Sequence, residues 1–145
     1  MSNTRRIKMK KNKIRLAVVI IALLLVTLLA GCKGAGTTIT SGPKGITFEF
    51  KELKKDVKDE ATAKFTFDDG ILTVELESGT ANVEICSTTE PDEDLPDSYM
   101  ELDTLYEAEG LKNGDEIEVN GVRGNVVMRV WGDGKNGKVK ISPKK

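Results

Sequence analysis

The chain has 145 residues, with 22 Lys and Arg against 23 Asp and Glu, two cysteines and no histidine. The lack of histidine excludes Ser–His–Asp and Cys–His catalysis and the histidine-rich zinc sites. Only carboxylate, lysine, serine or tyrosine chemistry remains for an enzyme, so we expect a non-catalytic protein.

The first 31 residues have the pattern of a secretory signal peptide. Residues 1–15 carry seven Lys and Arg and no acid, as the n-region of such a signal does. Residues 16–29 are apolar except for Thr27, a length that suits an h-region but falls short of the roughly 20 residues needed to cross a bilayer. We therefore expect a cleaved export signal and not a permanent membrane helix.

The apolar run ends in Leu29-Ala30-Gly31-Cys32. This segment resembles the lipobox of bacterial membrane lipoproteins, which implies a diacylglyceryl group on the Cys32 sulfur and cleavage between Gly31 and Cys32. Two acyl chains, at about 0.8 kcal/mol per buried CH₂, hold far more firmly than one. The resemblance implies an exported protein anchored to the outer leaflet of the cell membrane, or to the outer membrane if the bacterium has two membranes.

Removal of the signal changes the charge balance, because seven basic residues leave with it and residues 32–145 then have a net charge near −8. This balance argues against nucleic acid and anionic lipid head groups as partners, since both attract basic patches. Residues 32–45 contain the lipidated cysteine and a stretch rich in Gly and Thr, which is typical of a flexible linker with a span of roughly 20 Å. We expect one domain from residue 46 to residue 145.

From Ile46 onward, apolar and polar residues alternate with a period of two between Gly, Asp, Asn and Ser turns. The pattern predicts an all-β domain, an antiparallel β-sandwich of jelly-roll type with about eight short strands. The hairpin signals at 68–70 and 78–79 predict a three-strand meander over residues 61–87. Residues 51–63 fit a helical turn and a charged loop equally well. The expected strands cover 46–50, 65–67, 72–76, 83–85, 100–106, 115–119, 125–131 and 138–141.

Aromatic residues are candidates for a ligand site, because aromatic rings on one face of a sheet stack on sugars in carbohydrate-binding modules. Tyr99, Tyr106 and above all Trp131 are the candidates. In the strand 125–131, Val127 and Arg129 lie on the same side as Trp131. Val126 and Met128 lie on the other side, so one of the two sets faces outward. The alternative for Trp131 is a place in the core.

Acidic residues between Glu90 and Asp97 offer oxygen ligands of the kind that Ca²⁺ requires, and Asp92, Asp94 and Asp97 are the candidate ligands. Their spacing does not match an EF-hand, and a solvated loop is the simpler interpretation. The glycines of 132–137 match G-x-G-x-x-G, but a strand-like segment follows in place of the helix that a dinucleotide requires. We expect a tight hairpin connection there. Cys86 is unpaired once Cys32 is lipidated, and we interpret it as a structural thiol.

The sequence thus predicts a lipid-anchored, non-catalytic binding module of the cell envelope, with a protein or a glycan as its partner. The alternatives are a carbohydrate-binding module that uses exposed aromatics, a calcium-stabilised structural domain, and a small carboxylate-dependent hydrolase. We expect no cofactor, unless calcium binds.

Overall fold

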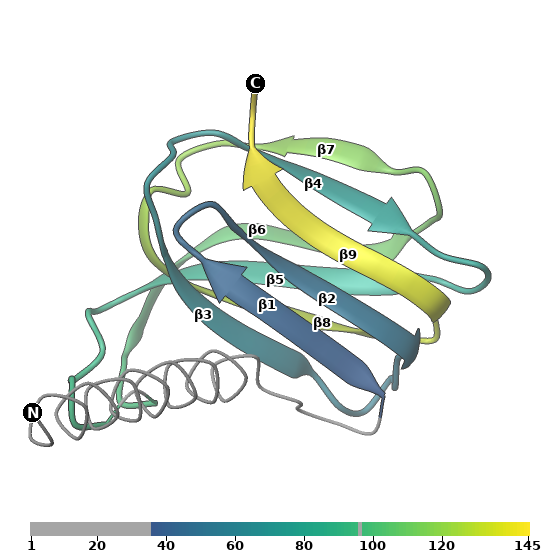
Figure 1. Ribbon diagram of the computed structural model, residues 1–145, viewed down its shortest axis with the longest axis horizontal. Helices are drawn as coiled ribbons and strands as arrows, with labels where there is room; N and C mark the ends of the chain where they lie inside the picture. Colours follow the sequence, from purple (N-terminus) through teal and green to yellow (C-terminus); the bar gives the residue numbers. More distant parts are fainter. Residues whose placement is uncertain (1–35, 96) are drawn as a thin grey trace, which may run out of the picture. The chain divides into compact units, whose positions relative to one another are not determined.

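A computed structural model describes residues 36–95 and 97–145, so the predicted export signal, the lipobox-like segment and Cys32 lie outside the described residues (Figure 1). Within these ranges the chain forms nine strands in two antiparallel sheets and no helix that is long and apolar enough to cross a membrane. The five-stranded sheet has the order β1 (Thr37–Gly42), β2 (Gly45–Glu52), β9 (Lys135–Pro143), β4 (Gly70–Glu75), β7 (Glu116–Val119). The four-stranded sheet has the order β3 (Asp59–Phe65), β8 (Gly124–Gly132), β5 (Ala81–Thr88), β6 (Glu101–Leu111).

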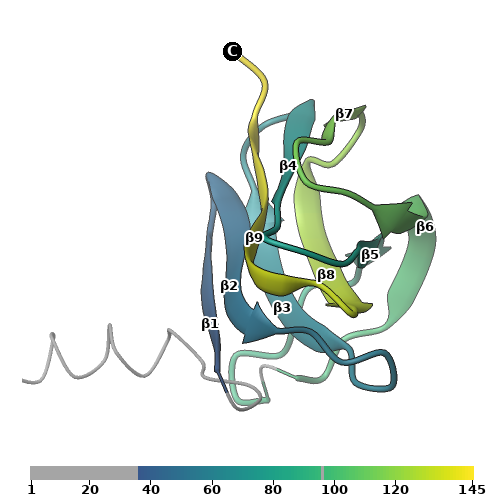
Figure 2. The same ribbon diagram turned by 90° about the vertical axis from the view of Figure 1, so that its right-hand side faces the viewer.

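The strand pairing is that of a jelly roll. β2 pairs with β9, β3 with β8, β4 with β7 and β5 with β6, all antiparallel. The chain from β2 to β9 is therefore one long two-stranded ribbon, wound so that successive pairs fall in opposite sheets. In Figure 2, β1, β2 and β9 lie on one side of the sandwich and β5, β6 and β8 on the other. The prediction of a jelly-roll β-sandwich is confirmed.

The core lies between the two sheets and takes alternate residues from the strands of both. β2 contributes Ile46, Phe48 and Phe50, whereas Thr47 and Glu49 between them are not buried. β8 contributes Val126, Met128 and Val130 from the other sheet. The period of two in the sequence thus marks the face that is removed from water, and this burial is the main force that holds the sheets together.

The predicted three-strand meander over residues 61–87 is wrong. β3 and β5 belong to the four-stranded sheet, where β8 lies between them, and β4 belongs to the other sheet. The turn residues at 68–70 and 78–79 therefore carry the chain from one sheet to the other. The same correction applies to the predicted hairpin after Gly132, because β8 and β9 also lie in different sheets. A turn signal marks a reversal of the chain, and it does not specify which strand becomes the neighbour.

Two predictions about the start of the domain also need correction. Residues 37–42 of the predicted flexible linker form β1, which pairs with β2 along its whole length and buries Ile39 in the core. Residues 59–63 of the ambiguous stretch belong to β3, and only residues 53–58 form a charged turn. β1 was missed because Thr-rich segments satisfy both linker and strand patterns, and its pairing with β2 decides between them.

Gly45 is the position where backbone conformation depends most visibly on glycine. Its φ is +144°, and a Cβ there would lie 2.1 Å from the carbonyl oxygen of Ile141. We expect Gly45→Ala to lower the free energy of unfolding by about 1–3 kcal/mol. Gly42, at the other end of the same turn, has open space for a Cβ and an ordinary φ, so Gly42→Ala is the matched control and is expected to change stability by less than about 0.5 kcal/mol. Urea denaturation of both variants is the measurement, and equal losses would contradict this explanation.

Candidate functional site

The outer face of the four-stranded sheet carries the polar residues of its central strands. On β8, Val126, Met128 and Val130 point into the core, so Arg129 and Trp131 point outward. Residues directly opposite each other on antiparallel strands share a face. Arg129 is paired with Glu60 of β3 on one side and with Glu84 of β5 on the other. The division of strand 125–131 into two faces is therefore as predicted, and the set with Trp131 faces outward.

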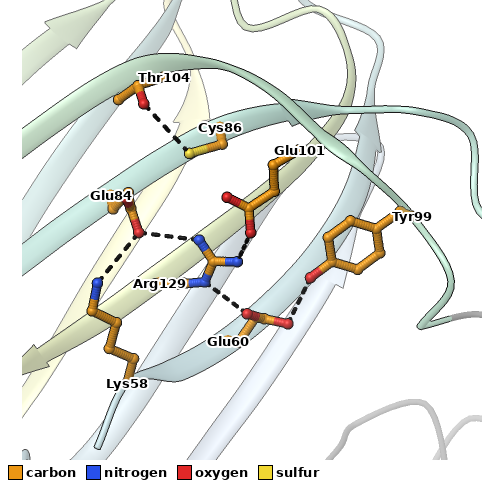
Figure 3. Close-up of polar contacts among 8 residues, drawn as sticks. All are labelled: Lys58, Glu60, Glu84, Cys86, Tyr99, Glu101, Thr104 and Arg129. Atoms are coloured by element: carbon orange, nitrogen blue, oxygen red, sulfur yellow. Dashed lines mark hydrogen bonds and ion pairs between the residues drawn. The ribbon is translucent and has the colours of Figure 1, made fainter. Parts of the chain in front are cut away.

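Arg129 is the centre of a network of charged side chains on this face (Figure 3). Its Nε donates to Glu60 at 2.7 Å and its Nη1 donates to Glu84 at 3.1 Å. Its Nη2 donates to Glu101, at the start of β6. The Arg129 side chain is only 15 % exposed. One guanidinium thus holds carboxylates from three strands, which uses the forked geometry that lysine lacks.

Tyr99 extends this network into the connection between β5 and β6. Its hydroxyl donates to the second oxygen of Glu60 at 2.7 Å. Burial, together with the hydrogen bond to ionised Glu60, raises the pKa of Tyr99 to about 12. Tyr99 and Glu101 lie at the end of this connection, and both form hydrogen bonds within the network. They therefore hold the connection against the outer face of the sheet.

The electrostatics of the network disfavour Glu101 as a general acid. The hydrogen bond from Arg129 lowers the pKa of Glu101, and the carboxylates in turn raise the pKa of Arg129. A general acid at neutral pH needs a raised carboxyl pKa, and Glu101 has the opposite shift. The arrangement therefore keeps Glu101 ionised and holds it in a fixed geometry.

Trp131 lies beside the network, half-buried and outside the hydrophobic core cluster. The Lys58 ammonium lies 4.1 Å from the centre of its ring and 3.5 Å from Glu84. A cation over an indole face contributes on the order of 1 kcal/mol. Asn82 of β5 is paired with Trp131 and shares its face. We call Trp131, Lys58, Asn82, Glu84 and Arg129 the outer-face site.

Tyr106 and Cys86 do not belong to this site. Tyr106 packs against the core, and burial raises its pKa. Cys86 is on the outer face opposite Val127, but it is only 4 % exposed, and its Sγ lies 3.9 Å from the Thr104 hydroxyl. Burial raises the pKa of the Cys86 thiol, which keeps it in the unreactive protonated form. Of the three aromatic candidates, the structure brings Tyr99 and Trp131 to one face.

The candidate calcium ligands Asp92, Asp94 and Asp97 are exposed in the β5–β6 connection. The Asp92 carboxylate accepts a hydrogen bond from the backbone N–H of Asp94 at 3.0 Å, which stabilises a local turn. Within residues 36–95 and 97–145, no group of three or more acidic or cysteine side chains has an arrangement that would hold a metal ion. The described residues of the acidic run form an exposed loop.

Sequence reasoning missed Glu60, Glu84 and Glu101 as members of one network. Each is a polar residue in an alternating strand, and nothing in its local pattern distinguishes it from other exposed acids. The available signal was Arg129, a charged residue in the otherwise apolar run 126–130. A buried or half-buried arginine needs carboxylate partners, but their identity depends on strand register.

No known protein family model matches the chain, and no curated protein matches it. Among solved structures, the chain is similar to CENP-C of Drosophila melanogaster bound to CAL1, at 16 % identity and a TM-score of 0.37, over 92 % of this chain and 99 % of that chain. It is similar to TmCBM61 in complex with β-1,4-galactotriose, at 10 % identity and a TM-score of 0.26, over 78 % of this chain and 70 % of that chain. It is also similar to a family 16 Carbohydrate Binding Module-2, at 11 % identity and a TM-score of 0.21, over 78 % and 77 % of the two chains. These TM-scores lie below 0.5, so no argument about function rests on them.

Proposed function

We propose that this protein is a lipid-anchored, non-catalytic binding module of the bacterial envelope, which takes a glycan at the outer-face site. The anchoring part rests on the lipobox-like segment that ends at Cys32. The binding part rests on the outer face of the four-stranded sheet.

The observation that carries the binding proposal is the position of Trp131. It is the sole tryptophan of the chain, and it lies on the outer face among charged and amide side chains. The ring is half-buried, lies outside the core and has the Lys58 ammonium over its face, so it offers an apolar platform for the C–H face of a sugar once Lys58 moves aside. Asn82, Glu84 and Arg129 supply hydrogen-bonding groups beside it, which is the combination that small-molecule sites use.

The non-catalytic part rests on the chemistry of the same face. The carboxylates there are engaged by Arg129, and its hydrogen bond keeps the pKa of Glu101 low. Glycoside hydrolysis requires one carboxyl group with a raised pKa beside a second carboxylate. The site is therefore suited to holding a ligand without cleaving it.

Titration with soluble glycans tests the binding proposal. We expect the Trp131 emission to shift when the protein binds one of three probes, namely chitohexaose, cellohexaose and β-1,4-galactan oligomers. Calorimetry with the same glycan should show at least about tenfold weaker binding for Trp131→Ala, the equivalent of 1.4 kcal/mol. Tyr106→Phe is the matched control, because Tyr106 lies away from the site, and it should bind like the unaltered protein. If no probe shifts the emission, or if Trp131→Ala binds with unchanged affinity, the glycan proposal is wrong.

A further inference from the structure

We infer that the domain stands on the membrane with one defined end, and that the turn between β2 and β3 contacts anionic lipid head groups there. This inference rests on the proposed anchoring at Cys32 and adds an orientation to it. We call residues 51–58, with the sequence Lys-Glu-Leu-Lys-Lys-Asp-Val-Lys, the basic turn.

Only a short stretch of chain joins the proposed anchor at Cys32 to the domain. The described chain begins at Gly36, whose carbonyl oxygen accepts a hydrogen bond from the backbone N–H of Lys51 at 3.2 Å. The next residue, Thr37, donates its hydroxyl to the buried Asp59 at 2.9 Å. Gly36 is four positions after Cys32 in the sequence, and this stretch of chain can span at most about 14 Å. The end of the sandwich that carries the basic turn is therefore held within that distance of the lipid.

The basic turn is held in place by backbone hydrogen bonds and presents exposed lysine and valine side chains. Leu53 is buried, and its N–H donates to the carbonyl of Gly134 at 2.8 Å. The carbonyl of Lys54 accepts from Gly132 at 3.2 Å, and Lys54 pairs with Val57 across the turn. Beyond this base, Lys54 and Lys55 are exposed, and Val57 is 52 % exposed. Lysines around an exposed apolar side chain form a tip that suits the head-group region of a bilayer.

The two connections that leave the four-stranded sheet at opposite ends differ in charge. The basic turn holds four lysines and two acids, whereas residues 89–100 hold five acids and no base. β3 begins beside the end of β8, and β5 ends beside the start of β8, so these two connections leave opposite ends of the four-stranded sheet. In Figure 1 the β5–β6 connection lies at the lower left and the turn after β2 at the lower right. The net charge near −8 of residues 32–145 does not describe the basic turn itself. An anionic surface repels the acidic connection 89–100 and attracts the basic turn.

The attraction between the basic turn and an anionic membrane is strong enough to orient a domain that is already tethered. A lysine near an anionic membrane surface contributes about 1 kcal/mol, and salt screens this contribution. Lys55 lies 3.6 Å from Asp133, but this pair is exposed and contributes little. Two or three lysines would not recruit a free protein strongly. For a domain that the lipid already holds at the surface, they are enough to select one orientation.

The rate at which each lysine is acetylated tests the inference, and this test does not depend on lipidation in the cell. All residues of the hydrophobic core lie between Ile39 and Ile141, so residues 32–145 contain the complete core. This fragment is coupled through Cys32 to a maleimide lipid in vesicles of phosphatidylcholine, with or without about 30 % phosphatidylglycerol. Cys86 is buried and does not compete for the maleimide. Acetylation by N-hydroxysuccinimidyl acetate is then followed by mass spectrometry for each lysine.

We expect acetylation of Lys51, Lys54 and Lys55 to slow about fivefold on vesicles with phosphatidylglycerol, the equivalent of about 1 kcal/mol. Lys44 and Lys145, at the opposite end, are exposed internal controls and should react at their solution rates. Both Lys54→Glu and Lys55→Glu in one variant should abolish the protection of Lys51, and so should high salt. Equal rates at all lysines, or equal protection at Lys44 and Lys54, would overturn the inference. The maleimide lipid replaces the cell's own lipidation in this experiment. A negative result would therefore contradict the orientation without bearing on whether Cys32 is lipidated in the cell.

Discussion

Arg129→Met is expected to lower the free energy of unfolding by about 3 kcal/mol at neutral pH. The Arg129 guanidinium is 15 % exposed and donates to Glu60, Glu84 and Glu101. Methionine keeps much of the apolar stem but leaves three carboxylates facing one another without a cation. Partly buried charges that lose their partner cost several times more than an exposed ion pair contributes. Urea denaturation at neutral pH measures the loss.

The pH dependence separates this explanation from a simple packing defect. In the unaltered protein the folded-state pKa of Glu101 is lowered, so its stabilisation is present above the ordinary glutamate pKa near 4.5 and is lost as the pH falls through the folded-state value. In Arg129→Met the carboxylates repel one another, so their protonation as the pH falls removes this repulsion. The stability difference between the two proteins should therefore shrink as the pH falls.

The matched control for Arg129→Met is the same substitution combined with Glu60→Gln, Glu84→Gln and Glu101→Gln. This variant removes the cation and the carboxylates together, so it should recover most of the lost stability. Two results together would show that the network contributes through packing and not through charge. The combined variant would lose as much unfolding free energy as Arg129→Met alone, and the stability difference between Arg129→Met and the unaltered protein would not shrink at low pH.

Cys32→Ser is expected to abolish attachment of the lipid. Serine has nearly the same size as cysteine but lacks the thiol on which a thioether with diacylglycerol is built. Without the lipid, the expected cleavage before residue 32 also fails, and the chain keeps its first 31 residues. Metabolic labelling with an alkyne fatty acid, followed by mass spectrometry of the intact protein, measures both effects.

The control for Cys32→Ser is Cys86→Ser, which removes the other cysteine of the chain. Because Cys86 is buried in the sandwich, this variant should carry the fatty-acid label and lose its signal like the unaltered protein. Labelling that persists in Cys32→Ser, or a parent protein that retains residues 1–31 without any label, would overturn the lipoprotein proposal.

Strand positions and the buried faces of strands were predictable because both depend on local patterns. The alternation in 46–50 and in 125–131 matches the inward and outward faces of β2 and β8. Burial of every second side chain is a property of any strand with one face in a core, whatever its neighbours are. For the same reason the class of fold, two packed sheets, followed from the number and spacing of the alternating runs.

Strand neighbours were not predictable in the same way. The turn signals at 68–70 and 78–79 are real, yet they lead from sheet to sheet, and β1 went unrecognised in a Gly- and Thr-rich segment. A local signal states that the chain reverses or extends, whereas pairing depends on segments that are distant in the sequence. β1 is a strand because the edge of β2 offers it hydrogen-bonding groups and because Ile39 reaches the core.

The proposed export signal and the proposed modification of Cys32 depend on a short run of consecutive residues, which processing enzymes would recognise without the folded domain. The order of residues by itself therefore carries that prediction, as it does the periodic pattern of the strands. The grouping of Glu60, Glu84 and Glu101 around Arg129, and the separation of the basic turn from the acidic connection, arise from the tertiary structure alone. Side chains as far apart as positions 60 and 129 meet only when two strands pair in one register, and no local pattern encodes that pairing.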